Sequence, residues 1–237
     1  MKILAFDSTA KVASAAVTED NKALAVYSID NGLTQSELLL PMAEAILKSL
    51  RIDFSDIGAF AVTVGPGSFT GVRIGVSLVK GLAFGRDLPC VALSTLEALA
   101  ENLRGLDAVI VPCMDARRSQ LYTAIFLSDG EDIKRVTEDS AIPITTLYEM
   151  LEAYGDKKIY LVGDGYDVAY RELTSLGLTS LSHTPELLRS QNAASVGKLA
   201  KRKLDAGEYT TDENLSPIYL RMPQAERERL EKEKEKK

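Results

Sequence analysis

The stretch VTVGPGSFTGVRIG, residues 62–75, leads from a predicted strand through a glycine-rich turn into a predicted helix. Its first two glycines allow backbone angles closed to other residues, and the proline between them stiffens the turn. Ser68 or Thr70 can cap the helix that follows. Such a junction directs several backbone N–H groups at one point, so it is either a tight structural turn or a loop that holds an anion.

Two common nucleotide-binding motifs are excluded at this turn. A Walker A loop needs Lys and then Ser or Thr after its second glycine, whereas Gly71 is followed by Val72 and Arg73. A G-x-G-x-x-G fingerprint needs a third glycine where Thr70 stands. Any ligand role of the loop must therefore have another basis.

The bulk composition is that of an ordinary globular protein. The 237 residues are 46% hydrophobic and 26% charged, which is enough for one large domain or two small ones. The formal net charge of -6 argues against a free-standing nucleic-acid binder, although it allows work on RNA within a larger complex.

No targeting segment is expected from the sequence. The first apolar run is interrupted at Asp7, too early for a signal peptide, and no stretch approaches the roughly 18 apolar residues of a membrane span. Cys90 and Cys113 lie in apolar, strand-like surroundings and are expected to be reduced, buried thiols. These features favour a cytoplasmic protein that does not contact a membrane.

The same order of elements is predicted twice along the chain. In each half a strand and a hairpin are followed by a helix, a strand, a glycine-containing turn and a second helix, which is an α/β plan. We expect one α/β subdomain over 1–104, a second over 105–222, and a solvated charged tail over 223–237. The expected strands are 3–6, 12–17, 23–29, 59–64, 90–93, 108–113, 120–127, 133–136 and 159–162, and the expected helices are 34–50, 70–84, 94–103, 145–154, 167–176 and 192–204.

Two helices of the first half are apolar on too many sides for one core. Their apolar residues sweep roughly 220° in helix 34–50 and roughly 200° in helix 70–84, against the roughly 100° that a single core requires. Either a thick monomer core covers both sides, or one side packs on the sheet and the other on a partner protein; we favour the partner. Arg73, Ser77 and Lys80 form the polar wedge of the second helix. The predicted interface residues are Leu38, Met42, Ala45, Phe69, Ile74, Leu78 and Leu82.

Four motifs together resemble the TsaB (YeaZ) family. They are ILAFDST at 3–9, GPGSFTGVRIG at 65–75, MDAR at 114–117 and PIYLR at 217–221, and the similarity spans about residues 1–222. The resemblance implies an α/β fold of the actin, sugar kinase and Hsp70 type (ASKHA), in which two α/β subdomains face each other. It also implies a subunit of the bacterial machinery that makes threonylcarbamoyladenosine in tRNA.

The resemblance implies partners as well. Members of this family pair with the catalytic subunit TsaD through the two helices described above, and the ATPase TsaE joins them. TsaD transfers threonylcarbamoyl to N6 of adenosine 37 in tRNAs that read ANN codons. The resemblance therefore implies that this chain meets tRNA only through the complex, and its exposed apolar helices predict a homodimer when it is alone.

The residues needed for catalysis by that relative are missing. The catalytic family holds a metal with two histidines spaced i, i+4 on a helix, and Thr95 and Leu99 stand at the comparable positions here. The chain contains one histidine, His183, which is expected on the surface. We therefore expect no catalytic residue, no metal and no cofactor, and a metallopeptidase is disfavoured. The segment 115–118 is interpreted as an ion pair at a strand end, with a catalytic role as the alternative.

Nucleotide binding stays open from the sequence alone. Asp7, Ser8 and Thr9 form a turn after the first strand, where folds of this type place a phosphate-facing loop. A second turn, made of Gly163, Asp164 and Gly165, has the same place in the second half. Backbone amides there could hold phosphate and either Asp could hold Mg²⁺, or both could be simple β-turns. The first interpretation makes the chain a stand-alone ATPase or kinase, which is the alternative function.

Overall fold

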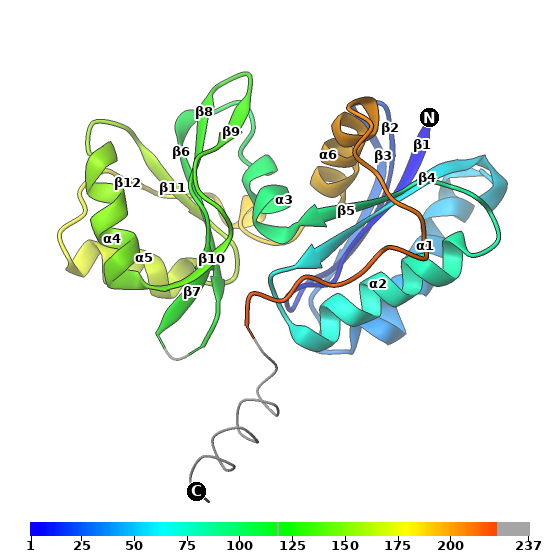
Figure 1. Ribbon diagram of the computed structural model, residues 1–237, viewed down its shortest axis with the longest axis horizontal. Helices are drawn as coiled ribbons and strands as arrows, with labels where there is room; N and C mark the ends of the chain where they lie inside the picture. The colour runs from blue at the N-terminus through cyan, green and yellow to red at the C-terminus, as the bar shows by residue number, and fades with distance from the viewer. Residues whose placement is uncertain (118, 222–237) are drawn as a thin grey trace, which may run out of the picture.

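The computed structural model describes residues 1–117 and 119–221 and contains two α/β units side by side (Figure 1). The charged tail expected over 223–237, and Arg118, lie outside the described residues. No helix in the part of the chain that is described has the length and apolar character needed to cross a membrane.

The first unit is built on a five-stranded mixed sheet with the strand order β3-β2-β1-β4-β5. The first two strands form an antiparallel pair, and the third extends it as a hairpin, whereas β4 and β5 run parallel to β1. The carboxyl ends of the three parallel strands therefore meet at one edge of the sheet, where sites in α/β proteins usually lie. The strands are β1 (Lys2–Asp7), β2 (Ala13–Glu19), β3 (Lys22–Ile29), β4 (Ile57–Gly65) and β5 (Cys90–Ser94).

Helices cover both faces of this sheet. Helix α1 (Gln35–Leu50) and helix α2 (Phe69–Ala83) pack on one face, and helix α6 (Ala193–Asp205) packs on the other. The start of α1 is fixed because the Thr34 backbone N–H donates to the Glu37 carboxylate at 3.1 Å. Each of these helices begins where the sequence predicts it, within one residue.

The second unit holds a seven-stranded sheet. Its main order is β10-β7-β6-β11-β12, and β8 pairs with β6 and with β9. Helices α4 and α5 cover one face, while α3 fills the other and connects the two units. The bounds are α3 (Thr95–Glu101), β6 (Asp107–Asp115), β7 (Gln120–Thr123), β8 (Phe126–Asp129), β9 (Ile133–Arg135), β10 (Ser140–Pro143), α4 (Ile144–Leu151), β11 (Ile159–Val162), α5 (Tyr166–Ser175) and β12 (Leu181–Ser182).

One predicted strand was wrong in this unit. The expected strand 120–127 is two strands, β7 and β8, which both pair with β6 at different levels. They separate because the Ile125 backbone N–H donates to the Thr137 hydroxyl at 2.8 Å instead of to β6. Strands β10 and β12 were not predicted, and β12 has only two residues, too few to show a period of two.

The end of the described chain returns to the first unit. Helix α6 lies on the first sheet, and the C-terminal strap, residues 208–221, crosses that unit beside β5 and α2 (Figure 1). Its Thr210 exchanges two backbone hydrogen bonds with Cys90, and its Ile218 N–H donates to the Val64 carbonyl at 2.8 Å. The range 105–222 that the sequence suggested for a second subdomain thus includes a helix and a strap that pack on the first sheet.

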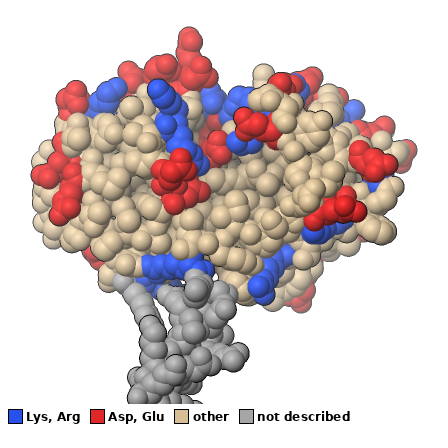
Figure 2. All heavy atoms as spheres, viewed as in Figure 1, with Lys and Arg blue, Asp and Glu red and all other residues tan. Residues whose placement is uncertain are grey.

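Ion pairs fasten the two units to each other beside α3. The Glu101 side chain is only 4% exposed and forms two ion pairs. Its Oε1 lies 2.8 Å from Arg104 Nε, and its Oε2 lies 2.7 Å from Nη2 of Arg202, which belongs to α6. Arg104 also reaches Asp132, in the β8–β9 hairpin, at 3.4 Å. Figure 2 shows acidic and basic side chains next to each other over the junction of the units. The two α/β units lie side by side, which agrees with the arrangement of two α/β subdomains that the resemblance implied.

Candidate functional site

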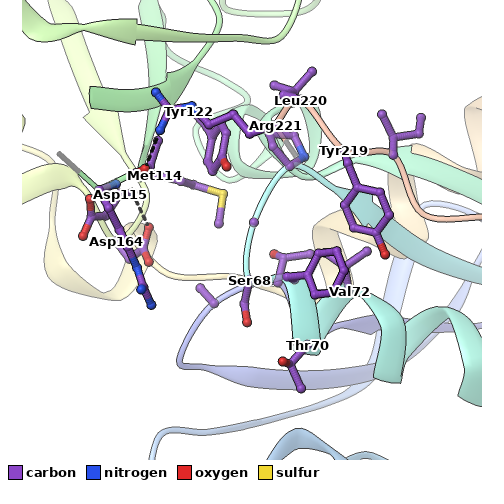
Figure 3. Close-up of a pocket in the computed structure, with 18 of the residues that line it drawn as sticks. Ser68, Thr70, Val72, Met114, Asp115, Tyr122, Asp164, Tyr219, Leu220 and Arg221 are labelled. Atoms are coloured by element: carbon purple, nitrogen blue, oxygen red, sulfur yellow. Dashed lines mark hydrogen bonds between the residues drawn. The ribbon is translucent and has the colours of Figure 1, made fainter. Parts of the chain in front are cut away.

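A cleft of about 500 Å³ lies between the two units. Its walls are the first turn of α2, the ends of β6 and β11, and the C-terminal strap. Figure 3 shows Ser68 and Thr70 on one wall, Asp115 and Asp164 on the opposite wall, and Tyr219 on the strap above them. Further lining side chains bring both charges and aromatic rings, among them Lys11, Phe69, Arg117, Tyr122 and Arg221.

The glycine-rich turn lies directly on the turn that follows β1. The Ser68 backbone N–H donates to the Thr9 carbonyl at 2.7 Å, and the Ser8 hydroxyl donates to the Gly71 carbonyl at 2.8 Å. A Cβ on Gly71 would overlap the Ser8 carbonyl oxygen, so a residue without a side chain is required at this contact. Ser8 is fully buried and its hydroxyl is bound to Gly71. Thr9 lines the cleft, but its N–H and its hydroxyl both donate to Asp7, so neither group is free to bind a phosphate.

Asp7 is an internal structural residue in this arrangement. Its side chain is 1% exposed, and Oδ1 accepts hydrogen bonds from the Thr9 N–H at 3.0 Å and from the Thr9 hydroxyl at 2.6 Å. Burial raises the pKa of Asp7 to about 6, although the bonds from Thr9 oppose the shift. Its Oδ2 atom is buried without a hydrogen-bond partner, so ionisation of this carboxyl is costly.

The turn at 163–165 packs against β6 in the second unit. The Gly165 N–H donates to the Cys113 carbonyl at 2.9 Å, and a Cβ on Gly163 would overlap that same oxygen. Asp164 instead faces the cleft and accepts a hydrogen bond from the Asp115 N–H at 3.4 Å. Partial desolvation raises the pKa of Asp164; the hydrogen bond from the Asp115 N–H opposes this shift, and the charge of the Asp115 carboxylate adds a smaller upward effect.

The acidic residues around the cleft do not assemble into a metal site. Within residues 1–117 and 119–221, no group of three or more His, Cys, Asp or Glu side chains could hold a metal ion. Asp115 accepts a hydrogen bond from the Arg117 backbone N–H at 2.6 Å, which closes the turn after β6. Of the two candidate nucleotide turns, only the second therefore offers a carboxylate to the cleft.

A second hollow, the α1–α2 groove, lies on the outer side of the helix pair. It encloses about 560 Å³ and is lined by apolar side chains with short polar ones between them. Its lining residues are Gln35, Ser36, Leu39, Leu40, Phe69, Thr70, Arg73, Ile74, Ser77 and Leu78. The groove meets the cleft at the start of both helices, because Gln35, Phe69 and Thr70 line both hollows.

The predicted interface residues divide between the core and this surface. Leu38 and Met42 are 8% and 2% exposed and belong to the core of the first sheet, so they cannot form part of an outer surface. The helical wheel included them because it cannot separate the sheet-facing arc from the outward arc. The remaining five, which are half-buried, are Ala45, Phe69, Ile74, Leu78 and Leu82. Leu40 was missed, although it is 42% exposed in the groove.

The polar wedge of α2 holds the C-terminal strap. Lys80 Nζ donates to the carbonyl of Glu213 at 3.0 Å and to that of Leu215 at 3.2 Å. Arg73 Nε donates to the Tyr219 hydroxyl at 2.7 Å. Helix α2 thus faces the sheet on one side and the strap on another, and its third side lines the groove.

The remaining candidate residues lie inside the fold or bond within it. Thr95 and Leu99 are buried in α3, which connects the units. His183 Nδ1 lies 2.9 Å from the Tyr166 hydroxyl, so it is part of a side-chain contact within the second unit. Burial raises the pKa of Cys90 to about 11 and that of Cys113 to about 12, which keeps both thiols protonated and unreactive.

Comparison with known proteins gives one consistent result. A family model described as TsaD, tRNA N6-adenosine threonylcarbamoyltransferase, matches residues 34–229. The tRNA threonylcarbamoyladenosine biosynthesis protein TsaB of Bacillus subtilis is 31% identical and aligns over 99% of this chain and 100% of its own length. A tRNA N6-adenosine threonylcarbamoyltransferase of Erythrobacter litoralis is 36% identical over 55% of this chain and 37% of its own.

A solved structure supports the same relationship. A Pseudomonas aeruginosa protein described as similar to peptidase YEAZ superposes with a TM-score of 0.77 and 26% identity, over 93% of this chain and 99% of that one. The two-unit fold is therefore shared along nearly the whole length of both chains.

Proposed function

The chain belongs to the TsaB family of tRNA threonylcarbamoyladenosine biosynthesis proteins, and from this premise we propose that it is a non-catalytic scaffold subunit. It pairs with TsaD, the subunit that transfers threonylcarbamoyl to N6 of adenosine 37 in ANN-decoding tRNAs. TsaE assembles with the pair, and tRNA is met only through the complex, in the cytoplasm.

The α1–α2 groove is the observation that carries this proposal. It is an apolar hollow between two helices whose opposite sides already cover the sheet, and Leu40 is exposed within it at 42%. Exposed apolar surface of this kind marks a protein interface. The similarity to threonylcarbamoyltransferases indicates that TsaD carries a related helix pair. Two related pairs can meet about an approximate two-fold axis, as in a symmetric dimer.

The residues inside and next to the cleft support the proposal that this chain does not catalyse a reaction. The Ser8 hydroxyl is bound to Gly71, and the Thr9 N–H and hydroxyl are bound to Asp7, so the first candidate phosphate turn has these donors already occupied. Thr95 and Leu99 provide neither metal ligand nor base at the positions where the resemblance places a histidine pair. Catalysis is therefore assigned to the partner, and this chain supports the partner's structure.

Mixing the purified chain with its cognate TsaD tests the proposal. Size-exclusion chromatography with light scattering should give a 1:1 heterodimer at micromolar concentrations, and absence of association there would overturn the proposal. Alone, the chain should show a mass that rises toward a dimer as concentration increases, because the same groove is then uncovered.

The cleft is the feature that favours the alternative proposal, in which the chain is a stand-alone nucleotide-binding enzyme. Its 500 Å³ volume, with Lys11, Asp164 and two tyrosine rings in the walls, is large enough for a nucleotide. Calorimetry of the chain alone with ATP and Mg²⁺ distinguishes the two functions. Micromolar binding that is lost in Asp164→Ala would favour the enzyme, and no heat of binding would favour the scaffold.

A further inference from the structure

Arg73 is held in one orientation at the rim of the α1–α2 groove. Its guanidinium carbon lies 3.8 Å from the centre of the Phe69 ring and 5.6 Å from that of the Tyr219 ring. Its Nε donates to the Tyr219 hydroxyl at 2.7 Å, and the two rings pack at 4.8 Å. One helix and the C-terminal strap therefore fix the side chain together, although it is exposed to solvent.

The charge of Arg73 has no counter-ion within the described part of the chain. Two other arginines that stack on rings each have one: Arg135 pairs with Asp139, and Arg189 pairs with Asp167 at 3.7 Å. None of the ion pairs among residues 1–117 and 119–221 includes Arg73. With Nε occupied by Tyr219, its two terminal nitrogens are available to an outside acceptor.

We infer that Arg73 binds a carboxylate of the partner subunit when that subunit's helices fill the groove; this rests on the proposed function. A guanidinium presents paired N–H groups that match the two oxygens of an Asp or Glu carboxylate. Because Phe69 and Tyr219 already hold the side chain, little conformational entropy is lost when the pair forms. The acceptor is a carboxylate at the edge of the apolar contact, where charged pairs set register and partner choice.

The C-terminal strap thereby becomes part of the docking surface. Tyr219 belongs to the strap, and the strap is held on α2 by Lys80 through two carbonyl oxygens. Removing the Tyr219 hydroxyl frees Nε and loosens the arginine, but it leaves the ring in place. The Tyr219→Phe change should therefore weaken binding less than removal of the guanidinium.

Isothermal titration calorimetry with purified cognate TsaD tests the inference. Arg73→Gln should weaken binding by roughly tenfold to a hundredfold, the range expected for a charged hydrogen-bonded pair. Arg73→Lys, which keeps the charge without the paired N–H groups, should recover part of the loss. The Arg73→Gln complex should also lose part of the salt dependence of the Kd, which a purely structural change would leave intact.

Arg86→Gln is the matched control. Arg86 also stacks on a ring, 4.2 Å from the centre of Phe54, and makes no ion pair among the described residues, but it does not line the groove. This variant should bind as the wild type does. An equal loss of affinity in Arg86→Gln would overturn the inference, because the effect would then be one of general charge.

The outcomes separate the two proposals. A wild-type chain that does not bind TsaD overturns the proposed function. A wild-type chain that binds, with Arg73→Gln within twofold of its Kd and with an unchanged salt dependence, overturns this inference alone. Single Asp→Asn and Glu→Gln changes on TsaD then complete the test: one of them should weaken wild-type binding and have no further effect on Arg73→Gln.

Discussion

The Ser8 hydroxyl donates a hydrogen bond of 2.8 Å to the carbonyl oxygen of Gly71, across 63 residues of sequence. This bond joins the turn after β1 to the first turn of α2, and the Ser68 N–H joins the same two segments through Thr9. Helix α2, which forms one wall of the groove and one wall of the cleft, therefore rests on the turn after β1. A shift of this helix would therefore change the shape of both the α1–α2 groove and the cleft.

Substituting the glycine at this contact should destabilise the protein. A Cβ in Gly71→Ala would overlap the Ser8 carbonyl oxygen, which is backbone and cannot rotate away. We expect a loss of about 3 kcal/mol in the free energy of unfolding, in the upper part of the range for overpacking. Urea denaturation followed by circular dichroism measures it.

Gly81→Ala is the control for that substitution. Gly81 lies in the same helix, and no atom outside its own stretch of helix lies within 4 Å of the place that a Cβ would take. Alanine there should raise the free energy of unfolding by about 0.5–1 kcal/mol through helix propensity. Equal effects of the two substitutions would show that Gly71 is not in close contact with the turn.

The turn after β1 also predicts how the chain responds to nucleotide. Because the Ser8 hydroxyl is bound to Gly71 and the Thr9 N–H and hydroxyl are bound to Asp7, millimolar ATP with Mg²⁺ should leave the melting temperature of the isolated chain unchanged. A ligand present at 100 times its Kd would instead add about 2.7 kcal/mol of stability. Thermal scans with ATP, ADP and buffer alone give the comparison, and an ATP-specific rise in Tm would contradict this prediction.

Most of the first unit was predictable because its signals are local. Helix α2 starts at Phe69 as expected from the capping pattern, with the Ser68 hydroxyl accepting from the Gly71 N–H at 3.3 Å. The surplus of apolar residues on the two helices was also visible as a periodicity. The sequence did not show which of these apolar residues face outward. Leu38 is buried and Leu40 is exposed because the sheet packs against only one side of α1, and the position of the sheet is not visible in the sequence of the helix.

Long-range contacts explain what the sequence could not reveal. The sequence predicted Arg73 and Lys80 only as part of the polar wedge of α2. They contact the C-terminal strap because residues 213–219 return to this helix. The nearest signal was the PIYLR motif, which marks the strap without showing what it touches. The break between β7 and β8 likewise depends on a distant hydroxyl, that of Thr137.

The buried carboxyl of Asp7 predicts a pH dependence of stability. Its pKa is about 6 in the folded chain against an ordinary 3.8, so the folded state binds the proton more tightly than the unfolded state does. The contribution of this group to the free energy of unfolding is therefore greatest at low pH and falls as the pH rises from about 4 to 6. The total fall is about 3 kcal/mol, because each unit of difference in pKa corresponds to about 1.36 kcal/mol.

Asp7→Asn isolates that contribution. The amide oxygen can still accept from Thr9, but it carries no charge to desolvate. The difference in unfolding free energy between variant and wild type should thus shift in favour of the variant as pH rises from 4 to 7. Urea titrations at several pH values measure it, and a difference that is constant with pH would show that Asp7 titrates normally.

The groove predicts that an exposed leucine matters more for binding than for folding. Leu40→Glu places a charge in the α1–α2 groove, where an apolar partner surface would have to desolvate it. We expect at least a hundredfold loss of affinity for TsaD, with a Tm within a few degrees of wild type because the side chain is 42% exposed. Leu176→Glu, at an equal exposure of 42% in the other unit, should bind normally. Equal loss in both variants, or unfolding of Leu40→Glu, would mean that the groove belongs to the monomer and not to its interface.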